Sequence, residues 1–115
     1  TEFNVEPNLP LTEKLTVNSK LNIIEKLFEN QVIGPEAFAI YNNELYTTLL
    51  NGDIVKIDKN DKLTKVQFQD NTIGRSRPLG ITFDENGTMY VCDAFKGIWM
   101  KEKSSETVTY LIKAS

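Results

Sequence analysis

A pair of arginines and a glycosylation sequon are the side chains whose type and spacing first suggest chemistry. Arg75 and Arg77 stand beside Pro78, where they could clamp an anion, although two solvated loop charges are the ordinary arrangement. Asn86-Gly87-Thr88 is an acceptor sequence for an N-linked glycan. The same Asn-Gly pair also favours a tight turn. Asn86 is therefore expected at an exposed hairpin tip, as a glycosylation site or simply as part of the turn.

The residue types that are rare or missing exclude much catalytic chemistry. The chain has no histidine and a single cysteine, Cys92, which excludes a Ser-His-Asp or Cys-His arrangement, an internal disulfide and a thiolate cluster for zinc. No cofactor-binding motif and no catalytic residue can be named. The net charge is -3, with lysines and arginines scattered among acids. Without a basic stripe to track a phosphate backbone, we expect no nucleic-acid partner.

The composition is that of an ordinary globular segment. Of the 115 residues, 40% are hydrophobic and 25% are charged, which argues against disorder. No apolar run approaches the roughly 20 residues that a membrane helix needs, and no signal peptide is evident. Because the chain begins at Thr1 rather than Met, a signal or a membrane anchor could lie outside it.

An internal repeat organises the chain from residue 34 onward. The pattern Pro, apolar run, Leu-Tyr or Met-Tyr, then Gly and an apolar pair occurs at 35–55 and again at 78–99. Matching residues are offset by 43 to 45 positions. A period of this length filled with short β-prone runs is typical of one four-stranded propeller blade. The sequence therefore predicts an all-β fold, a fragment of about two blades of a β-propeller.

The repeat sets the expected boundaries. Residues 1–33 form a lead-in segment, residues 34–76 the first blade and residues 77–115 the second. Eight strands are expected, at 37–40, 45–50, 54–58, 62–68, 79–84, 89–93, 97–101 and 108–113. In the lead-in, the apolar spacing at 21–28 suits a short helix about as well as an irregular strand. Four aromatic residues are expected to pack between blades, namely Tyr46, Tyr90, Phe95 and Trp99.

Two acidic residues break the repeat. Glu36 precedes the innermost strand of the first blade, where the second repeat has Leu79. It is expected to face the central channel, where it caps backbone N–H groups, pairs with an arginine or ligates a metal. Asp93 lies at a strand end where the first repeat has Leu49, and is expected to bond the turn that follows it.

Several stretches resemble the strictosidine synthase-like propellers. They are Gly-Pro-Glu at 34–36, Asn-Gly-Asp-Ile-Val at 51–55, Arg-Pro-Leu-Gly at 77–80 and Asp-Ala-Phe-Lys-Gly at 93–97. The resemblance implies a six-bladed propeller about three times as long as this chain, which would be its N-terminal third. It also implies a luminal or extracellular location, with or without an N-terminal anchor. A cysteine pair that relatives often carry before the arginine motif is absent, and the motif itself is spread over residues 74–78.

The resemblance implies two kinds of function. The parent propeller is an arylesterase-like hydrolase or a condensing enzyme that binds a small-molecule ligand in its channel, or a non-catalytic glycosylated luminal or cell-surface binding protein. Related propellers bind calcium through a glutamate at the place of Glu36, so calcium is the expected cofactor of the complete ring. This chain alone should be inactive, and its nearest partners should be the remaining blades. The alternative that 115 residues are the whole product stays open.

Overall fold

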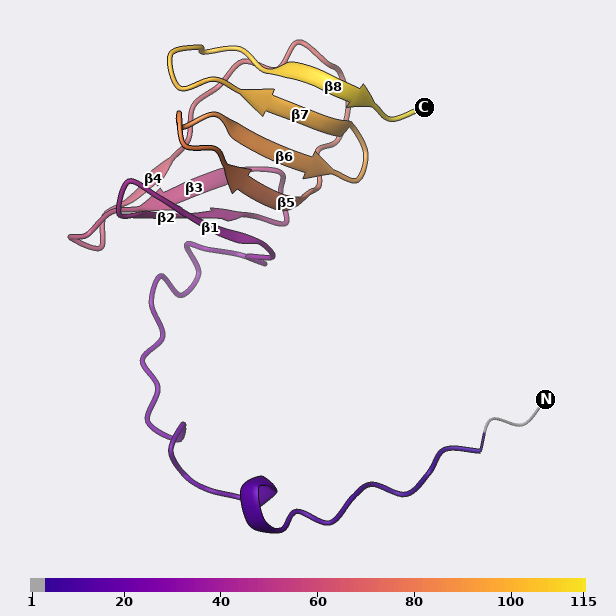
Figure 1. Cartoon of the computed structure of the whole chain (residues 1–115). Coiled ribbons are helices and arrows are strands. Elements are labelled where there is room, and N and C mark those ends of the chain that lie inside the picture. The colour runs from indigo at the N-terminus through magenta and orange to yellow at the C-terminus, as the bar shows by residue number, and fades with distance from the viewer. Residues whose placement is uncertain (1–3) are drawn as a thin grey trace.

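The computed structural model describes residues 4–115, and strands dominate it (Figure 1). The one helical element among these residues is a 3-10 helix, η1 (Glu13–Leu15). The first antiparallel sheet contains β1 (Phe38–Tyr41), β2 (Glu44–Thr48), β3 (Ile54–Ile57) and β4 (Leu63–Lys65). The second contains β5 (Pro78–Phe83), β6 (Met89–Asp93), β7 (Gly97–Lys101) and β8 (Thr109–Lys113). In both sheets, spatial order follows chain order. The all-β prediction is confirmed.

The turns follow from residues that tolerate a positive φ. Gly52 lies between β2 and β3 with φ +94°, and Gly87 lies between β5 and β6 with φ +84°. Both Asn-Gly turns therefore occur where the sequence placed hairpins, because only glycine adopts this φ without strain. Between β1 and β2 a two-residue loop places Asn42 and Asn43 at φ +51° and +60°, as in a type I′ turn.

The fourth strand of the first sheet is shorter than predicted. A strand was expected over 62–68, but β4 ends at Lys65. The chain then leaves the sheet because the next apolar side chains turn toward the second sheet. Phe68 packs on Trp99 with ring centroids 5.1 Å apart, and Val66 lies against the same core. Burial of these residues between the sheets thus outweighs continued strand pairing.

The core lies between the two sheets. Its buried members are Ile54 from β3, Met89 and Val91 from β6, and Trp99 from β7. The innermost strands β1 and β5 are neighbours, so the sheets are related as consecutive blades. The crossing segment adds a parallel bridge from Gln69 to Thr107.

The aromatic residues do not all behave as expected. Tyr46 packs with the inter-sheet core, and Trp99 belongs to it. Tyr90 is one position out of phase with buried Met89 and Val91, so it points to the opposite face of its sheet. Phe95 does not pack between the two described sheets: the residue is 52% exposed, because it stands in the tight β6–β7 turn rather than on a strand.

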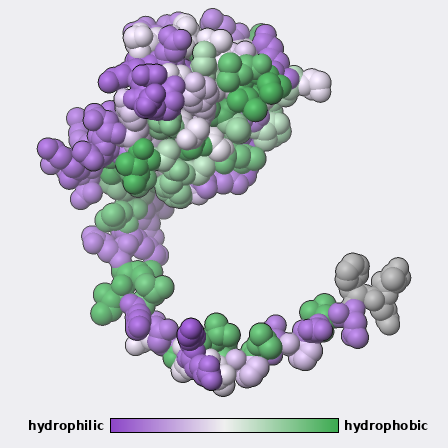
Figure 2. Space-filling view, in the orientation of Figure 1, coloured by the Kyte–Doolittle hydropathy of each residue, from purple (hydrophilic) through white to green (hydrophobic). Residues whose placement is uncertain are grey.

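From residue 4 up to the first sheet, the lead-in segment extends away from the two sheets (Figure 1). Over residues 21–28 it forms neither the helix nor the strand that its apolar spacing allowed. Its apolar side chains, among them Leu21, Ile24 and Leu27, are exposed. Figure 2 shows green, hydrophobic groups at intervals along the extended chain. Although Leu27 and Phe28 line a groove on the first sheet, most of this apolar face stays exposed, and amphipathic spacing alone does not stabilise a short helix.

Candidate functional site

Glu36 and Arg77 meet at the edge where the innermost strands begin. Glu36 stands two residues before β1, and Arg77 stands directly before β5. The Nη2 atom of Arg77 lies 3.5 Å from Oε2 of Glu36, with the two side chains 37% and 46% exposed. We call these two residues the rim pair. Pairing with an arginine was one of the roles expected for Glu36, and its arrangement here leaves both side chains open to solvent.

The described residues do not by themselves fit a calcium site. Calcium takes six to eight oxygen ligands, carboxylates foremost. Among residues 4–115, no three histidine, cysteine, aspartate or glutamate residues gather as a metal-holding group. Glu36 supplies one carboxylate, and its neighbour Arg77 is a cation. The role of Glu36 as a calcium ligand stays a prediction.

The two arginines have different partners. The guanidinium of Arg75 stands over the Phe95 ring, 5.3 Å from its centroid, a cation–π distance. Arg77 instead reaches Glu36. Each arginine thus contacts a different residue, and the two do not form a clamp in this structure.

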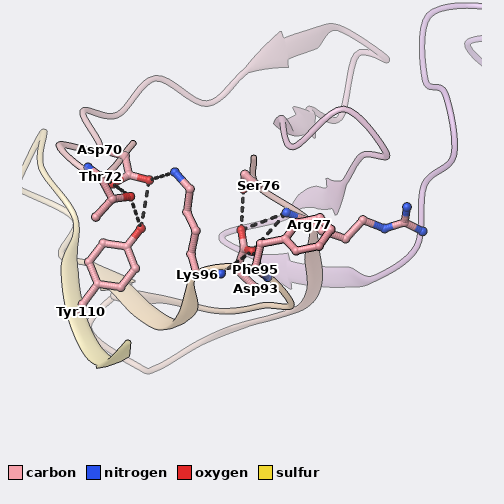
Figure 3. Close-up of polar contacts among 8 residues, drawn as sticks. All are labelled: Asp70, Thr72, Ser76, Arg77, Asp93, Phe95, Lys96 and Tyr110. Carbon is pink, nitrogen blue, oxygen red and sulfur yellow. Dashed lines mark hydrogen bonds and ion pairs between the residues drawn. The ribbon is translucent and has the colours of Figure 1, made fainter. Parts of the chain in front are cut away.

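Asp93 organises the loop that carries the rim. Its buried carboxylate accepts hydrogen bonds from Ser76 Oγ at 2.5 Å, from the backbone N–H of Arg77 at 3.1 Å, and from those of Phe95 and Lys96 at 2.9 and 3.1 Å. Figure 3 shows these donors converging on the carboxylate while the Arg77 guanidinium extends away from it. The expected turn role is therefore present, and Asp93 additionally fixes the backbone of Arg77.

A second polar cluster was not found by sequence reasoning. Lys96 Nζ lies 2.6 Å from Oδ2 of Asp70, with side chains 11% and 16% exposed. Asp70 also accepts from Thr72 Oγ1 at 2.7 Å and from Tyr110 at 2.9 Å (Figure 3). Burial opposes ionisation of Asp70, but these donors outweigh it and lower its pKa to about 2. Asp70 lies in the non-repeating crossing segment, and Lys96 and Tyr110 are far from it in sequence, so no local pattern marks the cluster.

Asn86 occupies the exposed tip of the β5–β6 hairpin. The carboxylate of Asp84 accepts from the backbone N–H groups of Asn86 and Thr88, at 3.0 and 2.9 Å. These bonds hold the turn through the backbone. The position is exposed, as the sequence predicted, and glycan attachment there stays a prediction.

An apolar groove lies on the face of the first sheet that points away from the second. It encloses about 390 Å³ and is lined chiefly by apolar side chains of the sheet and the lead-in, including Leu27, Phe28, Phe38, Leu45 and Ile57. We call it the blade 1 groove. Phe38 is 58% exposed there, so this face lacks the cover that the second sheet gives to the opposite face.

Comparison with known proteins identifies the family. The model of the strictosidine synthase-like N-terminal region matches residues 14–57. Adipocyte plasma membrane-associated protein of Homo sapiens is 37% identical over 118 residues, covering 89% of this chain and 28% of the relative. The Bos taurus protein is 37% identical over 109 residues, covering 81% and 26%. The Drosophila melanogaster protein named adipocyte plasma membrane-associated protein Hemomucin is 31% identical over 120 residues, covering 96% and 20%.

These matches place the two sheets in a larger molecule. The chain spans only about a quarter of the length of the mammalian relatives that it matches. In the part of the chain that the structure describes, no helix is both long and apolar enough to cross a membrane. The all-β architecture agrees with the matched family, and its two sheets are consecutive blades of a propeller whose ring this chain does not close. The chain belongs to the strictosidine synthase-like family and corresponds to an N-terminal part of its β-propeller.

Proposed function

We propose that the complete protein is a propeller hydrolase that binds a small organic ester in its central channel, with the rim pair contacting the ligand. The observation that carries this proposal is the solvent-open contact between Glu36 and Arg77, which stand just before the innermost strands of adjacent blades. A carboxylate and a guanidinium together offer an acceptor and a forked donor to a polar ligand. The catalytic groups would lie on blades beyond residue 115, so the present chain alone is inactive under this proposal.

The test uses the complete protein and phenyl acetate as the ester. Glu36→Gln removes the carboxylate charge and should lower kcat/KM about tenfold, equivalent to about 1.4 kcal/mol of transition-state stabilisation. Glu85→Gln, an exposed carboxylate at the far hairpin, is the matched control and should leave the rate unchanged. No hydrolysis by the complete protein, or equal rates for both variants, would overturn the proposal. Product formation from an amine and an aldehyde without ester hydrolysis would instead identify a condensing enzyme.

Calcium enters this proposal only as a cofactor of the complete ring. Glu36 would supply one carboxylate oxygen, and the remaining ligands would come from other blades. Calcium binding by the complete protein should then weaken in Glu36→Gln, as measured by isothermal titration with calcium chloride. If the wild-type protein binds no calcium, or if the variant binds it equally well, Glu36 is not a ligand.

A second candidate function is that of a glycosylated, membrane-associated binding protein of the luminal or extracellular side. Exposure of Asn86 at a hairpin tip favours it, because the transferase needs an accessible sequon. The matched relatives carry the name plasma membrane-associated protein. In cells, the mass of the complete protein should fall on enzymatic removal of N-glycans. Asn86→Gln should remove that shift, whereas an unchanged shift would place the glycan elsewhere.

The remaining blades are the partners that we propose for the blade 1 groove. The opposite face of the same sheet is already covered by the second blade, which shows how a blade face of this chain is buried. A blade encoded beyond residue 115 would cover Phe38 and Ile57 in the same manner. Hydrogen exchange in the complete protein should show β1 and β3 as well protected as β6. Fast exchange of both strands would indicate an open ring.

A further inference from the structure

A crevice between the blades lies at the opposite end of the inner strands from the rim pair. It opens where β1 ends at Tyr41 and β5 ends at Phe83, and it encloses about 230 Å³. Its walls come from the two sheets, the β1–β2 loop, Val66 after β4, the turn that contains Gly87 and the segment after β7. Unlike a central channel, this crevice is therefore formed without any residue beyond 115. We call it the basal crevice.

The floor of the basal crevice is aromatic and apolar. The rings of Tyr41 and Phe83 are stacked, with centroids 5.1 Å apart and planes 14° apart. Tyr46 packs on Phe83 with centroids 4.6 Å apart, and buried Met89 lies beside them. At Gly87 a Cβ atom would overlap the Tyr41 hydroxyl, so glycine is what allows Tyr41 to lie against the turn. Flat aromatic surfaces favour contact with a ring.

One wall is polar but electrically balanced. Lys56 Nζ donates to both carboxylate oxygens of Glu44, at 2.8 and 3.0 Å, and Tyr46 donates its hydroxyl to the same carboxylate at 3.1 Å. The bond from Lys56 lowers the pKa of Glu44. Burial, followed by the nearby Glu44 charge, raises the pKa of Tyr46 to about 12. At neutral pH this wall holds one carboxylate and one ammonium, whose charges cancel.

The other wall carries uncompensated positive charge. Lys101 and Lys103 both line the crevice, and neither takes part in an ion pair among the described residues. Lys103 Nζ stands 6.0 Å from the centroid of the Tyr41 ring, so its charge lies over the aromatic floor. Lys101 donates to a backbone carbonyl, that of Glu102, and so has no carboxylate partner among the described residues. Together these lysines give the crevice an excess charge of +2 that a ligand anion would neutralise.

We propose that the basal crevice binds a small carboxylate carried on a single ring. The ring would lie on the Tyr41–Phe83 floor, and the carboxylate would accept hydrogen bonds from Lys101 and Lys103. The cavity is smaller than the roughly 300–1,000 Å³ typical for drug-sized ligands, so it suits one ring rather than several. An aromatic acid and a sugar acid share this chemistry. The site lies apart from the rim pair and does not depend on the function proposed for the channel.

The experiment is a titration of the complete protein with benzoate, glucuronate and the neutral analogue benzamide, observed by ligand NMR. The double variant Lys101→Gln/Lys103→Gln should weaken carboxylate binding about tenfold, since each exposed charged contact is worth up to about fivefold. Lys113→Gln is the matched control, because Lys113 stands 5.9 Å from the Tyr110 ring but does not line the crevice. Glu36→Gln separates this site from the channel.

The outcomes distinguish binding in the basal crevice from binding in the channel. Binding of benzoate or glucuronate that falls in the double variant but not in Lys113→Gln or Glu36→Gln supports it, and the tighter of the two acids identifies the ring. Binding lost in Glu36→Gln instead would place the carboxylate in the channel and overturn the proposal. So would equal affinity for benzamide and benzoate, equal affinity in the double variant, or no binding of either acid. Neither lysine is buried, so the variants should fold.

Discussion

The two blades share a strand plan but differ where their strands end. At the end of the second strand, blade 1 has Leu49 and blade 2 has Asp93, with exposed fractions of 6% and 5%. The Leu49 side chain is apolar, whereas the Asp93 carboxylate receives hydrogen bonds from Ser76 and from three backbone N–H groups. A buried position can therefore keep its place in the repeat while its chemistry changes completely.

The polar clusters of the two blades differ in the same way. In blade 2 the Lys96–Asp70 pair is nearly buried and ties the crossing segment to the sheet. In blade 1 the Lys56–Glu44 pair joins neighbouring strands and is more exposed, at 33% and 24%. Buried pairs are strongly destabilised when one partner is removed, whereas exposed pairs are worth little. The comparison therefore predicts that polar substitutions destabilise blade 2 more than blade 1.

The largest effect is expected when blade 2 is given the residue of blade 1. Asp93→Leu leaves the N–H groups of Arg77, Phe95 and Lys96 without their acceptor, and each buried unsatisfied donor costs about 1–3 kcal/mol. We expect a loss of about 3–5 kcal/mol of unfolding free energy, measured by urea denaturation of the complete protein. Leu49→Ala, the matched change in blade 1, should cost about 2–3 kcal/mol through its cavity. A cost below about 1 kcal/mol for Asp93→Leu would show that the hydrogen bonds to the Asp93 carboxylate do not hold the turn.

The internal repeat explains how much of the fold and of the candidate site could be predicted from the sequence. Strand period, Asn-Gly turns and the matched apolar runs predicted both sheets, because these features are local and occur twice. The departures Glu36 and Asp93 were visible for the same reason, since a repeat shows where it is broken. Phe95 was predicted to pack between blades because residue type alone does not distinguish an aromatic residue in a three-residue turn from one on a strand.

The missed features are non-local. Asp70 acquires its role only through Lys96 and Tyr110, which approach it when the crossing segment folds over blade 2. No spacing rule relates residues on a loop, a turn and an outer strand. The early end of β4 has a similar cause, because the inter-blade packing of Phe68 against Trp99 overrides local strand propensity. The basal crevice likewise requires the two sheets to be placed side by side.

A smaller effect is expected from the Asp70 cluster, and it depends on pH. The pKa of Asp70 falls from an ordinary 3.8 to about 2 in the folded protein. Because the folded-state value is the lower one, the cluster stabilises the fold above about pH 4, and this contribution of about 2 kcal/mol is lost as the pH falls toward 2. Asp70→Asn should therefore lower stability at pH 7 and flatten its dependence on pH between 4 and 2.

Blade 1 supplies the control for that experiment. Glu44→Gln alters a carboxylate whose pKa is also lowered, but its pair with Lys56 is more exposed and should contribute less than about 1 kcal/mol. Urea denaturation at pH 7, 4 and 2 measures both variants. If Glu44→Gln flattens the pH dependence of stability between pH 4 and 2 as much as Asp70→Asn does, then burial does not explain the difference between the two pairs.

The smallest effect on stability is expected at the rim pair, which joins the two blades. A half-exposed ion pair at 3.5 Å should contribute about 0–1 kcal/mol, so Glu36→Gln and Arg77→Gln should each change the unfolding free energy only slightly. A double-mutant cycle measures their coupling, which should shrink further in 0.5 M sodium chloride because surface charges are screened. A calcium site at Glu36 would give a different result: calcium would stabilise the wild-type protein by mass action and stabilise Glu36→Gln less. Coupling well above 1 kcal/mol without calcium would instead mean that the blades beyond residue 115 bury the pair, and the rim would then be part of the core rather than of the channel.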